Sequence, residues 1–421
     1  MRLDFLLHSA SEIVCLTEAP QRGAALGTLN LLPGGAVAVR DAFIVDVGPS
    51  PELRRKHLAA RQIDAPGLVL LPGFVDPHTH AMWIGDRAAE FELRIAGRTY
   101  SEILAVGGGI LSTVDQTRAA SVADLVAATR PRLRRMLAHG TTTCEIKTGY
   151  GLDLDSELRM LEAIARLRRS MPMTILATFL PAHAIPREHT ANPDAYVDAI
   201  VERMLPRAIA RWRELAGEDA PLFVDVFCEK GAFTLAQSRR ILERARALGY
   251  RPKIHADEFE NLGGTKLAVE LGAISADHLV TTSKAEIAAL GASPTVAVAL
   301  PGTPFGLAQP GYTPARALIA AGATLALASD FNPGTSPCES MQMAIAIACR
   351  SMRLTPAEAI AAATINASAA LGLADRVGSL TPGKLADVIA LEIPSYRHIG
   401  YRYGTNLVKR VMRGGRLVTR G

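Results

Sequence analysis

The middle of the chain alternates between two patterns of apolar and polar residues. Between residues 67 and 375, short apolar runs are separated by longer stretches in which apolar positions recur every three or four residues. The first pattern predicts buried strands and the second predicts amphipathic helices. The predicted strands are 69–75, 141–147, 174–180, 223–228, 252–255, 273–278, 295–300 and 324–329. The clearest helical patterns are 121–139, 155–170, 235–248 and 313–321.

These eight strands, with helices between most of them, predict an α/β fold, a (β/α)8 TIM-type barrel of parallel strands. An open, doubly wound sheet is the alternative arrangement. Such a sheet would more often carry a glycine-rich phosphate loop after its first strand, and the sequence has none there. The pattern therefore favours the closed barrel.

The two ends of the chain carry short β-rich runs between glycine and proline turns. They lie at 13–16, 36–39 and 43–47, and again at 387–391, 408–412 and 417–419. Neither set of strands could bury its apolar face alone. We therefore expect residues 1–66 and 376–421 to form one composite β-sandwich domain, and residues 67–375 to form the barrel.

Polar residues gather where the predicted strands end, which is where a barrel of this type carries its chemistry. Five of the ten histidines of the chain fall at or just after a strand end, together with several carboxylates and a lysine. Random placement would rarely give this distribution, so a site is the better explanation. The residues at these positions are His78, His80, Glu145, Lys147, His183, Glu229, His255, Glu258, His278 and Asp330.

Four of these side chains form a plausible set of metal ligands. His78 and His80 are two residues apart in an extended segment, so both imidazoles point to the same side. With His255 and Asp330 they offer nitrogen and carboxylate ligands suited to Zn²⁺ or a similar divalent ion, leaving a position for water. The bound ion would lower the pKa of that water toward neutrality.

The remaining polar groups suggest hydrolysis. Asp330 could accept the proton of the water, and His278 could hydrogen-bond the hydroxide or the substrate oxygen. Glu258 could deliver a proton to the leaving nitrogen.

Each residue also has a purely structural interpretation. Asp330 could form a turn ahead of residues 331–334, Glu258 could cap or begin the next helix, and Glu145 and Lys147 could simply pair. These alternatives do not predict that all the groups meet at one face of a barrel.

Composition narrows the class of protein. A net charge of +5 spread over helical stretches, with 5% aromatic residues, indicates solvated helix faces and no nucleic-acid partner, and leaves open a preference for anionic small molecules. Five widely spaced cysteines without a C-x-x-C pair favour a reducing compartment. The N-terminus makes a poor signal peptide, and no apolar run reaches membrane-spanning length. We expect a cytoplasmic protein without a membrane partner.

Over essentially its whole length the chain resembles the metal-dependent amidohydrolase superfamily and, within it, the imidazolonepropionase family. The first of the motifs below is shared by many amidohydrolases, and the second to fourth point to the narrower family. The motifs are PGFVDPHTH at 72–80, GDRAAEF at 85–91, GGGILSTV at 107–114, EIKTGYGL at 145–152, HADE at 255–258, SADH at 275–278 and DFNPG at 330–334.

The resemblance implies hydrolytic opening of 4-imidazolone-5-propanoate to N-formimidoyl-L-glutamate, a step of histidine degradation, with one Zn or Fe ion per subunit. The metal ligands that it implies are His78, His80, His255 and Asp330, and the catalytic residues are Glu258, His278 and Asp330. The substrate-binding residues that it implies are Arg87, Tyr100, Tyr150, His183, Glu258, Asn332 and Gly334.

Arg87 would bind the propionate, since a guanidinium fork suits a planar carboxylate. The structural interpretation of Arg87 is a helix-surface arginine, which is what we expect of Arg94 and Arg98.

Several features depart from the family pattern. Trp83 places a bulky indole shortly after the two histidines, Thr148 stands where the family pattern has serine, and residues 207–221 form a longer stretch than usual. Cys228 and Glu229 occupy the position where a carboxylated lysine would hold a second ion, so we expect one metal.

Rival functions are another cyclic amidase, an aromatic-base deaminase, or a metal-stabilised scaffold without catalysis. A homodimer is compatible with the sequence, which does not set the oligomeric state.

Overall fold

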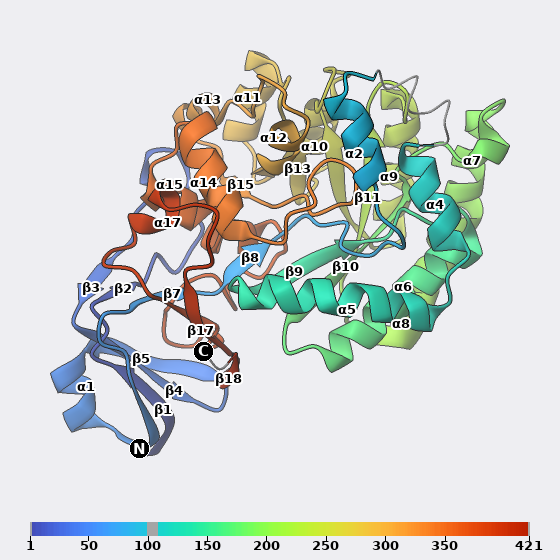
Figure 1. The fold of residues 1–421 in the computed structure, drawn as a ribbon. Helices are drawn as coiled ribbons and strands as arrows, with labels where there is room; N and C mark the ends of the chain where they lie inside the picture. The colour runs from blue at the N-terminus through green and yellow to red at the C-terminus, as the bar shows by residue number, and fades with distance from the viewer. Residues whose placement is uncertain (1, 99–107, 420–421) are drawn as a thin grey trace.

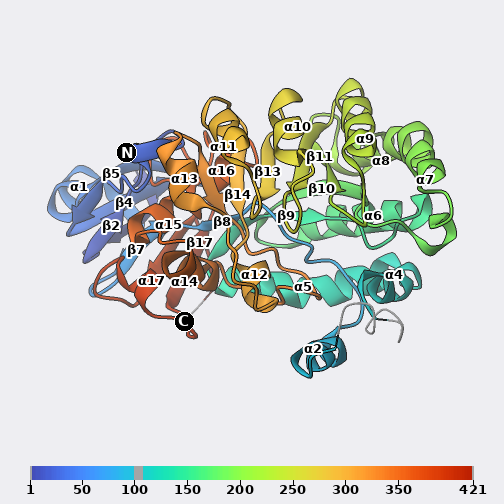
Figure 2. The same ribbon diagram turned by 90° about the horizontal axis from the view of Figure 1, so that it is seen from above.

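The computed structural model describes residues 2–98 and 108–419 (Figure 1). Helices surround a barrel, and β-sheets occupy one end of the molecule, where both chain termini lie in the two views (Figures 1 and 2). The short helix α2 (Ala88–Ile95) stands away from the other helices in Figure 2.

The barrel consists of eight parallel strands in sequence order, as the apolar pattern predicts. The barrel is closed by backbone hydrogen bonds between residues that follow its first strand and residues that follow its last strand. The Asp330 amide donates to the His78 carbonyl at 3.2 Å, and the His80 amide donates to the Phe331 carbonyl at 2.9 Å. The strands are β8 (Phe74–Asp76), β9 (Thr141–Lys147), β10 (Thr174–Ala182), β11 (Leu222–Cys228), β12 (Arg251–Ala256), β13 (Ser275–His278), β14 (Val296–Ala299) and β15 (Leu325–Leu327).

Several helices begin where a polar side chain accepts a hydrogen bond from a free backbone amide. Ser121 and Thr234 each form a capping box with the residue three positions later, and these boxes begin two of the predicted helices. The helices of the barrel and its loops, besides α2, are α4 (Ile110–Arg118), α5 (Val122–Ala138), α6 (Leu154–Ser170), α7 (Pro193–Ala199), α8 (Leu205–Ala216), α9 (Leu235–Ala247), α10 (Gly264–Glu270), α11 (Lys284–Gly291), α12 (Gly302–Gly306), α13 (Ala315–Ala320), α14 (Met341–Ser351), α15 (Pro356–Ala362) and α16 (Ile365–Ala369).

The two ends of the chain share a six-stranded sheet in the order β18-β17-β16-β7-β2-β3. A second sheet, β5-β4-β1-β6, is built from the N-terminal segment alone. Strands β1 and β6 were missed because Asp4 and His8 interrupt the first and most side chains of the second face solvent. The strands are β1 (Arg2–His8), β2 (Glu12–Val14), β3 (Leu31–Pro33), β4 (Gly35–Arg40), β5 (Phe43–Pro49), β6 (Leu58–Asp64), β7 (Val69–Pro72), β16 (Val388–Leu391), β17 (Val408–Arg413) and β18 (Arg416–Thr419). Helix α1 (Ser50–Lys56) packs against β4 and β5, whereas α17 (His398–Tyr401) packs against α14 and α15.

The prediction of one strand over residues 69–75 was wrong. The run divides at Gly73: β7 pairs with β16 and β2 in the terminal sheet, and β8 begins the barrel. An apolar run does not show which sheet a strand joins. The domain division at residue 66 remains a proposal, and this pairing suggests moving 69–72 to the terminal domain.

Gly73→Ala is expected to destabilise the protein by about 1–3 kcal/mol, the usual cost of overpacking. A Cβ at Gly73 would lie 2.2 Å from Oγ1 and 2.8 Å from Cβ of Thr142, a β-branched side chain with little freedom to move. The measurement is the free energy of unfolding in denaturant. Gly311→Ala is the control, because its added Cβ would make one ordinary contact, 3.4 Å from Val280; equal stability of the two variants would contradict the prediction.

Candidate active site

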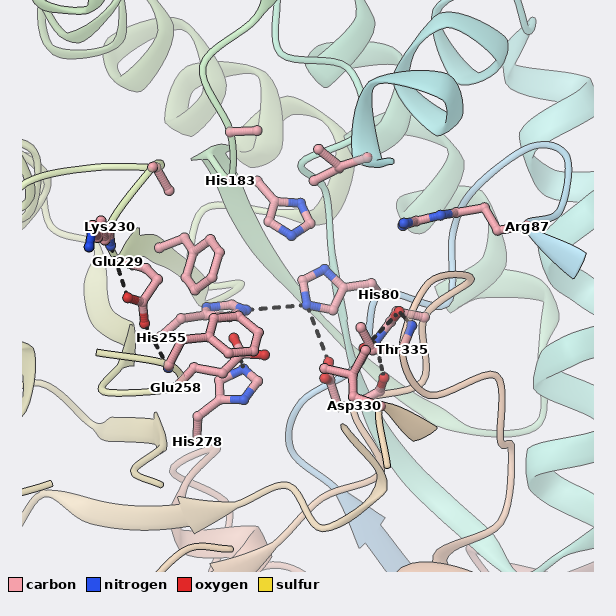
Figure 3. A pocket seen from close by; sticks show the side chains of 18 of the residues that line it. His80, Arg87, His183, Glu229, Lys230, His255, Glu258, His278, Asp330 and Thr335 are labelled. Atoms are coloured by element: carbon pink, nitrogen blue, oxygen red, sulfur yellow. Dashed lines mark hydrogen bonds and ion pairs between the residues drawn. The ribbon is translucent and has the colours of Figure 1, made fainter. Parts of the chain in front are cut away.

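A cavity of about 650 Å³ opens at the C-terminal ends of the barrel strands (Figure 3). It contains most of the side chains singled out from the sequence. Gly334 lies beside the cavity without lining it, His78 is fully buried, and Tyr100 lies outside the described residues. The residues singled out from the sequence that line the cavity are His80, Arg87, Tyr150, His183, Glu229, His255, Glu258, His278, Asp330 and Asn332.

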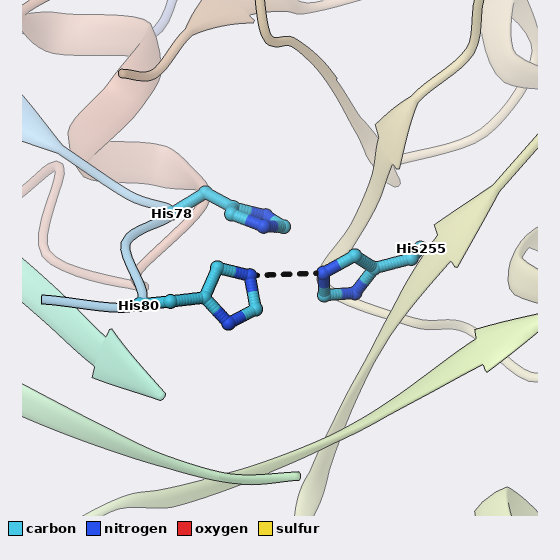
Figure 4. Close-up of side chains that lie close together, drawn as sticks. All are labelled: His78, His80 and His255. Atoms are coloured by element: carbon cyan, nitrogen blue, oxygen red, sulfur yellow. Dashed lines mark hydrogen bonds between the residues drawn. The ribbon is translucent and has the colours of Figure 1, made fainter. Parts of the chain in front are cut away.

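The four predicted metal ligands converge; Figure 4 shows the three histidines, and Figure 3 shows Asp330 beside His80. The ring nitrogens Nε2 of His80 and His255 are 3.2 Å apart, and Oδ1 of Asp330 lies 3.6 Å from Nε2 of both His78 and His80. Two ligand atoms on a tetrahedral zinc ion are about 3.3 Å apart, given Zn–N distances of about 2.0–2.1 Å. The spacing therefore fits a divalent ion.

The protonation of these groups also suits a metal. Burial lowers the pKa of His78 and His80 well below the usual value, so both rings are neutral, as metal ligands must be. Nε2 of His78 is buried without a hydrogen-bond partner. His278 forms a second possible ligand group with His78 and Asp330, whose ligand atoms lie within 4.8 Å of one another.

Asp330 follows β15 in a left-handed backbone conformation, with φ of 52°. The Thr303 hydroxyl donates to its Oδ2, which leaves Oδ1 toward the histidines. Burial raises the pKa of Asp330 to about 6, against the lowering effect of that hydrogen bond. The turn-forming role belongs instead to Asn332, whose Oδ1 accepts the amides of Gly334 and Thr335 at 2.8 Å each.

Glu258 and His278 face each other, with Oε2 and Nε2 3.5 Å apart. Burial raises the pKa of Glu258 well above its ordinary value, and Asp330 and Glu229 add to the effect. Burial also lowers the pKa of His278. The interpretation of Glu258 as a helix cap was wrong, because the next helix, α10, is capped at Gly263. Glu258 can therefore hold a proton close to the cluster.

His183 and Tyr150 form one wall of the cavity. The His183 Nδ1–H donates to the Gly149 carbonyl at 2.9 Å, so Nε2 carries a lone pair. Its ring stacks on His80 with centroids 4.7 Å apart, and the Tyr150 ring lies 5.3 Å away. Burial, with a smaller effect of His255, lowers the pKa of His183 to about 3. These rings offer a flat, neutral surface to a planar heterocycle.

Arg87 faces the cluster from the opposite side of the cavity (Figure 3). Its Nε and Nη2 donate to the Glu90 carboxylate at 2.8 and 2.5 Å, and its Nη1 lies against Gly334. The expectation that Arg94 is only a surface residue was wrong, since it lines the cavity and donates to the Gly334 carbonyl at 2.8 Å. Arg98 lines the cavity as well, so this side carries positive charge.

Sequence reasoning missed three fully buried charged residues, Asp225, Lys253 and Asp277. Oδ2 of Asp277 accepts the Nδ1–H of His78 at 2.6 Å, and Oδ2 of Asp225 lies 3.0 Å from Nδ1 of His255. The available signal was a charged residue inside an apolar strand. Glu145 and Lys147 do pair, with Oε1 and Nζ 2.8 Å apart.

Comparison with known families agrees with this geometry. Residues 69–418 match the model of the amidohydrolase family, and the chain belongs to this family. Within it, the chain belongs to the imidazolonepropionase family. Its relatives include the imidazolonepropionases of Herpetosiphon aurantiacus, 57% identical over 99% of this chain and 97% of that one, and of Symbiobacterium thermophilum, 50% identical over 99% and 97%. The enzyme is a hydrolase that acts on a cyclic amide C–N bond.

Solved structures support the fold. An adenosine deaminase from Xanthomonas campestris with bound zinc superposes with a TM-score of 0.75 at 20% identity, covering 100% of this chain and 93% of that one. The guanine deaminase of E. coli gives a TM-score of 0.69 at 15% identity, covering 99% of each chain. Among the described residues, no helix is both long and apolar enough to cross a membrane.

Proposed function

We propose that the chain hydrolyses 4-imidazolone-5-propanoate to N-formimidoyl-L-glutamate in the degradation of histidine. The observation that carries this proposal is a cavity with a histidine–aspartate cluster at one side and Arg87 at the other, in a chain 57% identical to an imidazolonepropionase. The cluster suits attack on the ring amide, and the guanidinium suits the propionate.

We assign the metal site to His78, His80, His255 and Asp330, with one Zn or Fe ion per subunit. Imidazole and carboxylate ligands suit both metals. When bound, the ion supplies Lewis-acid chemistry and lowers the pKa of a water toward neutrality. The features that support this ligand set are the buried, neutral imidazoles and the Oδ1 atom of Asp330, which faces them.

The protein side chains then move two protons. Asp330 accepts a proton from the attacking water, whose oxygen forms a bond to the carbonyl carbon of the ring. His278 hydrogen-bonds the carbonyl oxygen as negative charge develops on it. The ring C–N bond breaks, and Glu258, with its raised pKa, donates a proton to the leaving nitrogen.

The substrate is held at its two ends. Arg87 binds the propionate carboxylate, with Asn332 and Gly334 shaping the adjoining loop. Tyr150 and His183 lie against the ring, and we also assign Tyr100 to this wall from the family resemblance. The substrate is therefore a small anion, and neither a nucleic acid nor a membrane takes part. The five cysteines are free thiols, in keeping with a cytoplasmic enzyme.

A deaminase is the nearest alternative, because the fold is shared with adenosine and guanine deaminases. Uncharged bases carry no carboxylate for Arg87, which faces the cluster across the cavity. The test is loss of imidazolone ultraviolet absorbance on adding purified protein, with adenine and guanine assayed in parallel and metal content determined on the same sample. Ring opening without base deamination supports the proposal, and the reverse result rejects it.

Removing the metal by chelation is expected to lower ring-opening activity at least about 100-fold while the barrel stays folded. Zn²⁺ or Fe²⁺ should restore the activity. Mg²⁺ is the matched control, because it prefers oxygen ligands and should not restore it. Circular dichroism follows the fold during the titration. Unfolding of the stripped protein, with no turnover in the loaded one, would favour a metal-stabilised scaffold instead.

A further inference from the structure

Five charged side chains form a buried layer inside the barrel. All are fully buried, and none lines the cavity. The layer contains three carboxylates and two ammonium groups, so it is close to electrically balanced. Burying so many charges is costly unless they are paired, and an apolar barrel core would be at least as stable. The members of this layer are Glu145, Lys147, Asp225, Lys253 and Asp277.

Two of the carboxylates contact the outer nitrogens of proposed metal ligands. Asp277 accepts the Nδ1–H of His78 at 2.6 Å. Asp225 lies 3.0 Å from Nδ1 of His255, and its other oxygen accepts the His255 backbone amide at 3.2 Å. A histidine whose Nδ1–H points at a carboxylate presents the lone pair of Nε2 to a metal and is a more basic ligand. Asp225 and Asp277 therefore lie beside Nδ1 of His255 and His78, on the side of each ring away from the proposed ion.

The Lys147 ammonium group contacts Asp225 and lies near Asp277. Its Nζ lies 2.7 Å from Oδ2 of Asp225 and 4.0 Å from Oδ2 of Asp277, and it also donates to Glu145 at 2.8 Å. The oxygens that contact Lys147 are the same ones that face His255 and His78. One atom each from Asp225, Asp277 and His78 lie within 4.8 Å of one another. Two carboxylates this close repel strongly in a buried site unless a cation lies beside them.

We propose that Lys147 is a positioning residue for the metal site: it holds the Asp225 carboxylate beside Nδ1 of His255, so that His255 presents Nε2 to the ion. The inference rests on the proposed metal-dependent function. Without Lys147 the Asp225 carboxylate loses its ammonium partner, and His255 loses the carboxylate that is held beside its Nδ1. Loss of Lys147 should therefore weaken metal binding, although Lys147 does not line the cavity and its hydrogen bonds are to Glu145 and Asp225.

Lys253 is a matched control within the same layer. It is also fully buried, but its Nζ donates to the Pro77 carbonyl at 2.8 Å and lies 3.5 Å from Glu145 and 3.9 Å from Asp277. Both lysines therefore lie at a similar distance from Asp277, and the difference between them is the contact of Lys147 with Asp225 at 2.7 Å. Replacing either lysine removes one buried cation, so a merely structural role predicts similar effects.

The experiment compares Lys147→Met and Lys253→Met in the full chain. Zn²⁺ affinity is measured by competition with a chromophoric chelator, and the visible spectrum of the Co²⁺-loaded protein reports ligand geometry. Lys147→Met is expected to weaken Zn²⁺ binding by about 10–100-fold, as for loss of other groups that orient ligands, and to shift the Co²⁺ bands. Lys253→Met should change affinity several-fold less and leave the bands in place. Equal weakening in both variants, or unchanged affinity in Lys147→Met, overturns the inference.

Asp225→Asn gives a second route, should Lys147→Met not fold. It keeps the size of the side chain and removes its charge, so Zn²⁺ affinity should again fall about tenfold; an affinity equal to that of the unmodified chain overturns the inference. The outcomes separate the two proposals. An unmodified chain that binds Zn²⁺ and opens the imidazolone, with variants that bind equally tightly, rejects only the role of Lys147. An unmodified chain that binds no metal and opens no ring rejects the proposed function itself.

Discussion

Asp330→Asn is expected to lower kcat for ring opening by about 10³-fold while KM changes little. The carboxylate lies 3.6 Å from the inner nitrogens of His78 and His80, where it can accept the proton of the attacking water. Asparagine has the same shape but is neither a base nor a negative ligand, and loss of a positioned general base typically costs about 10²–10⁴-fold. Steady-state kinetics on metal-loaded protein measures the effect.

Metal content separates the two roles of Asp330. If the variant keeps its metal and kcat still falls, the loss of the proton-accepting role explains the lower kcat. If the variant no longer binds the metal, the loss of the ligand role explains it. Asp76→Asn is the matched control: Asp76 is a buried aspartate at the same end of the barrel, and it accepts hydrogen bonds from Ser329 outside the cavity. Its kcat should change less than about tenfold. A metal-loaded Asp330→Asn enzyme with near-normal kcat would remove Asp330 from the mechanism.

Arg87→Ala is expected to raise KM for imidazolonepropionate by about 100-fold with a smaller change in kcat. The guanidinium is held by Glu90 and faces the cluster across the cavity, so we expect it to bind the end of the substrate that does not react. A lost charge-assisted pair of about 2–3 kcal/mol corresponds to about 30–150-fold in affinity. Lysine at this position should recover only part of the loss, because it cannot form the planar fork.

Companion variants test whether position as well as charge matters. Gly334→Ala would place a Cβ 2.2 Å from Nη1 of Arg87, so it should raise KM while every arginine remains. Arg166→Ala is the control, because Arg166 also pairs with a glutamate on its own helix but lies on an exposed surface. An unchanged KM in Arg87→Ala would count against a carboxylate substrate and in favour of an uncharged base.

Much of the site could be predicted from sequence because strand ends in a parallel barrel converge. The i, i+2 spacing of His78 and His80 places both rings on one side, and the apolar runs before His255 and Asp330 mark the other strand ends. Local pattern and the general geometry of barrels were sufficient here. The assignment of Arg87 came from the family resemblance, since a helix-surface role was equally compatible with its local sequence.

The failures share one cause. The run 69–75 appeared to be one strand because burial looks the same in either sheet, while its division at Gly73 depends on pairing with β16, more than 300 residues later. Arg94 was assigned to a helix surface because its hydrogen-bond partner, Gly334, is distant in sequence. Asp225 and Lys253 were overlooked because a charge within an apolar strand carries no indication of its partner.

The sequence alone determined most strands and several helices of the barrel, and which histidines and carboxylates stand at the ends of its strands, because these depend on periodicity along the chain. Tertiary structure decided which side chains touch across the barrel: the contact of Asp277 with His78, the place of Lys147 between two carboxylates, and the side of the cavity that Arg87 faces. These contacts join strands far apart in sequence. Their distances of a few ångströms exist only once the barrel closes.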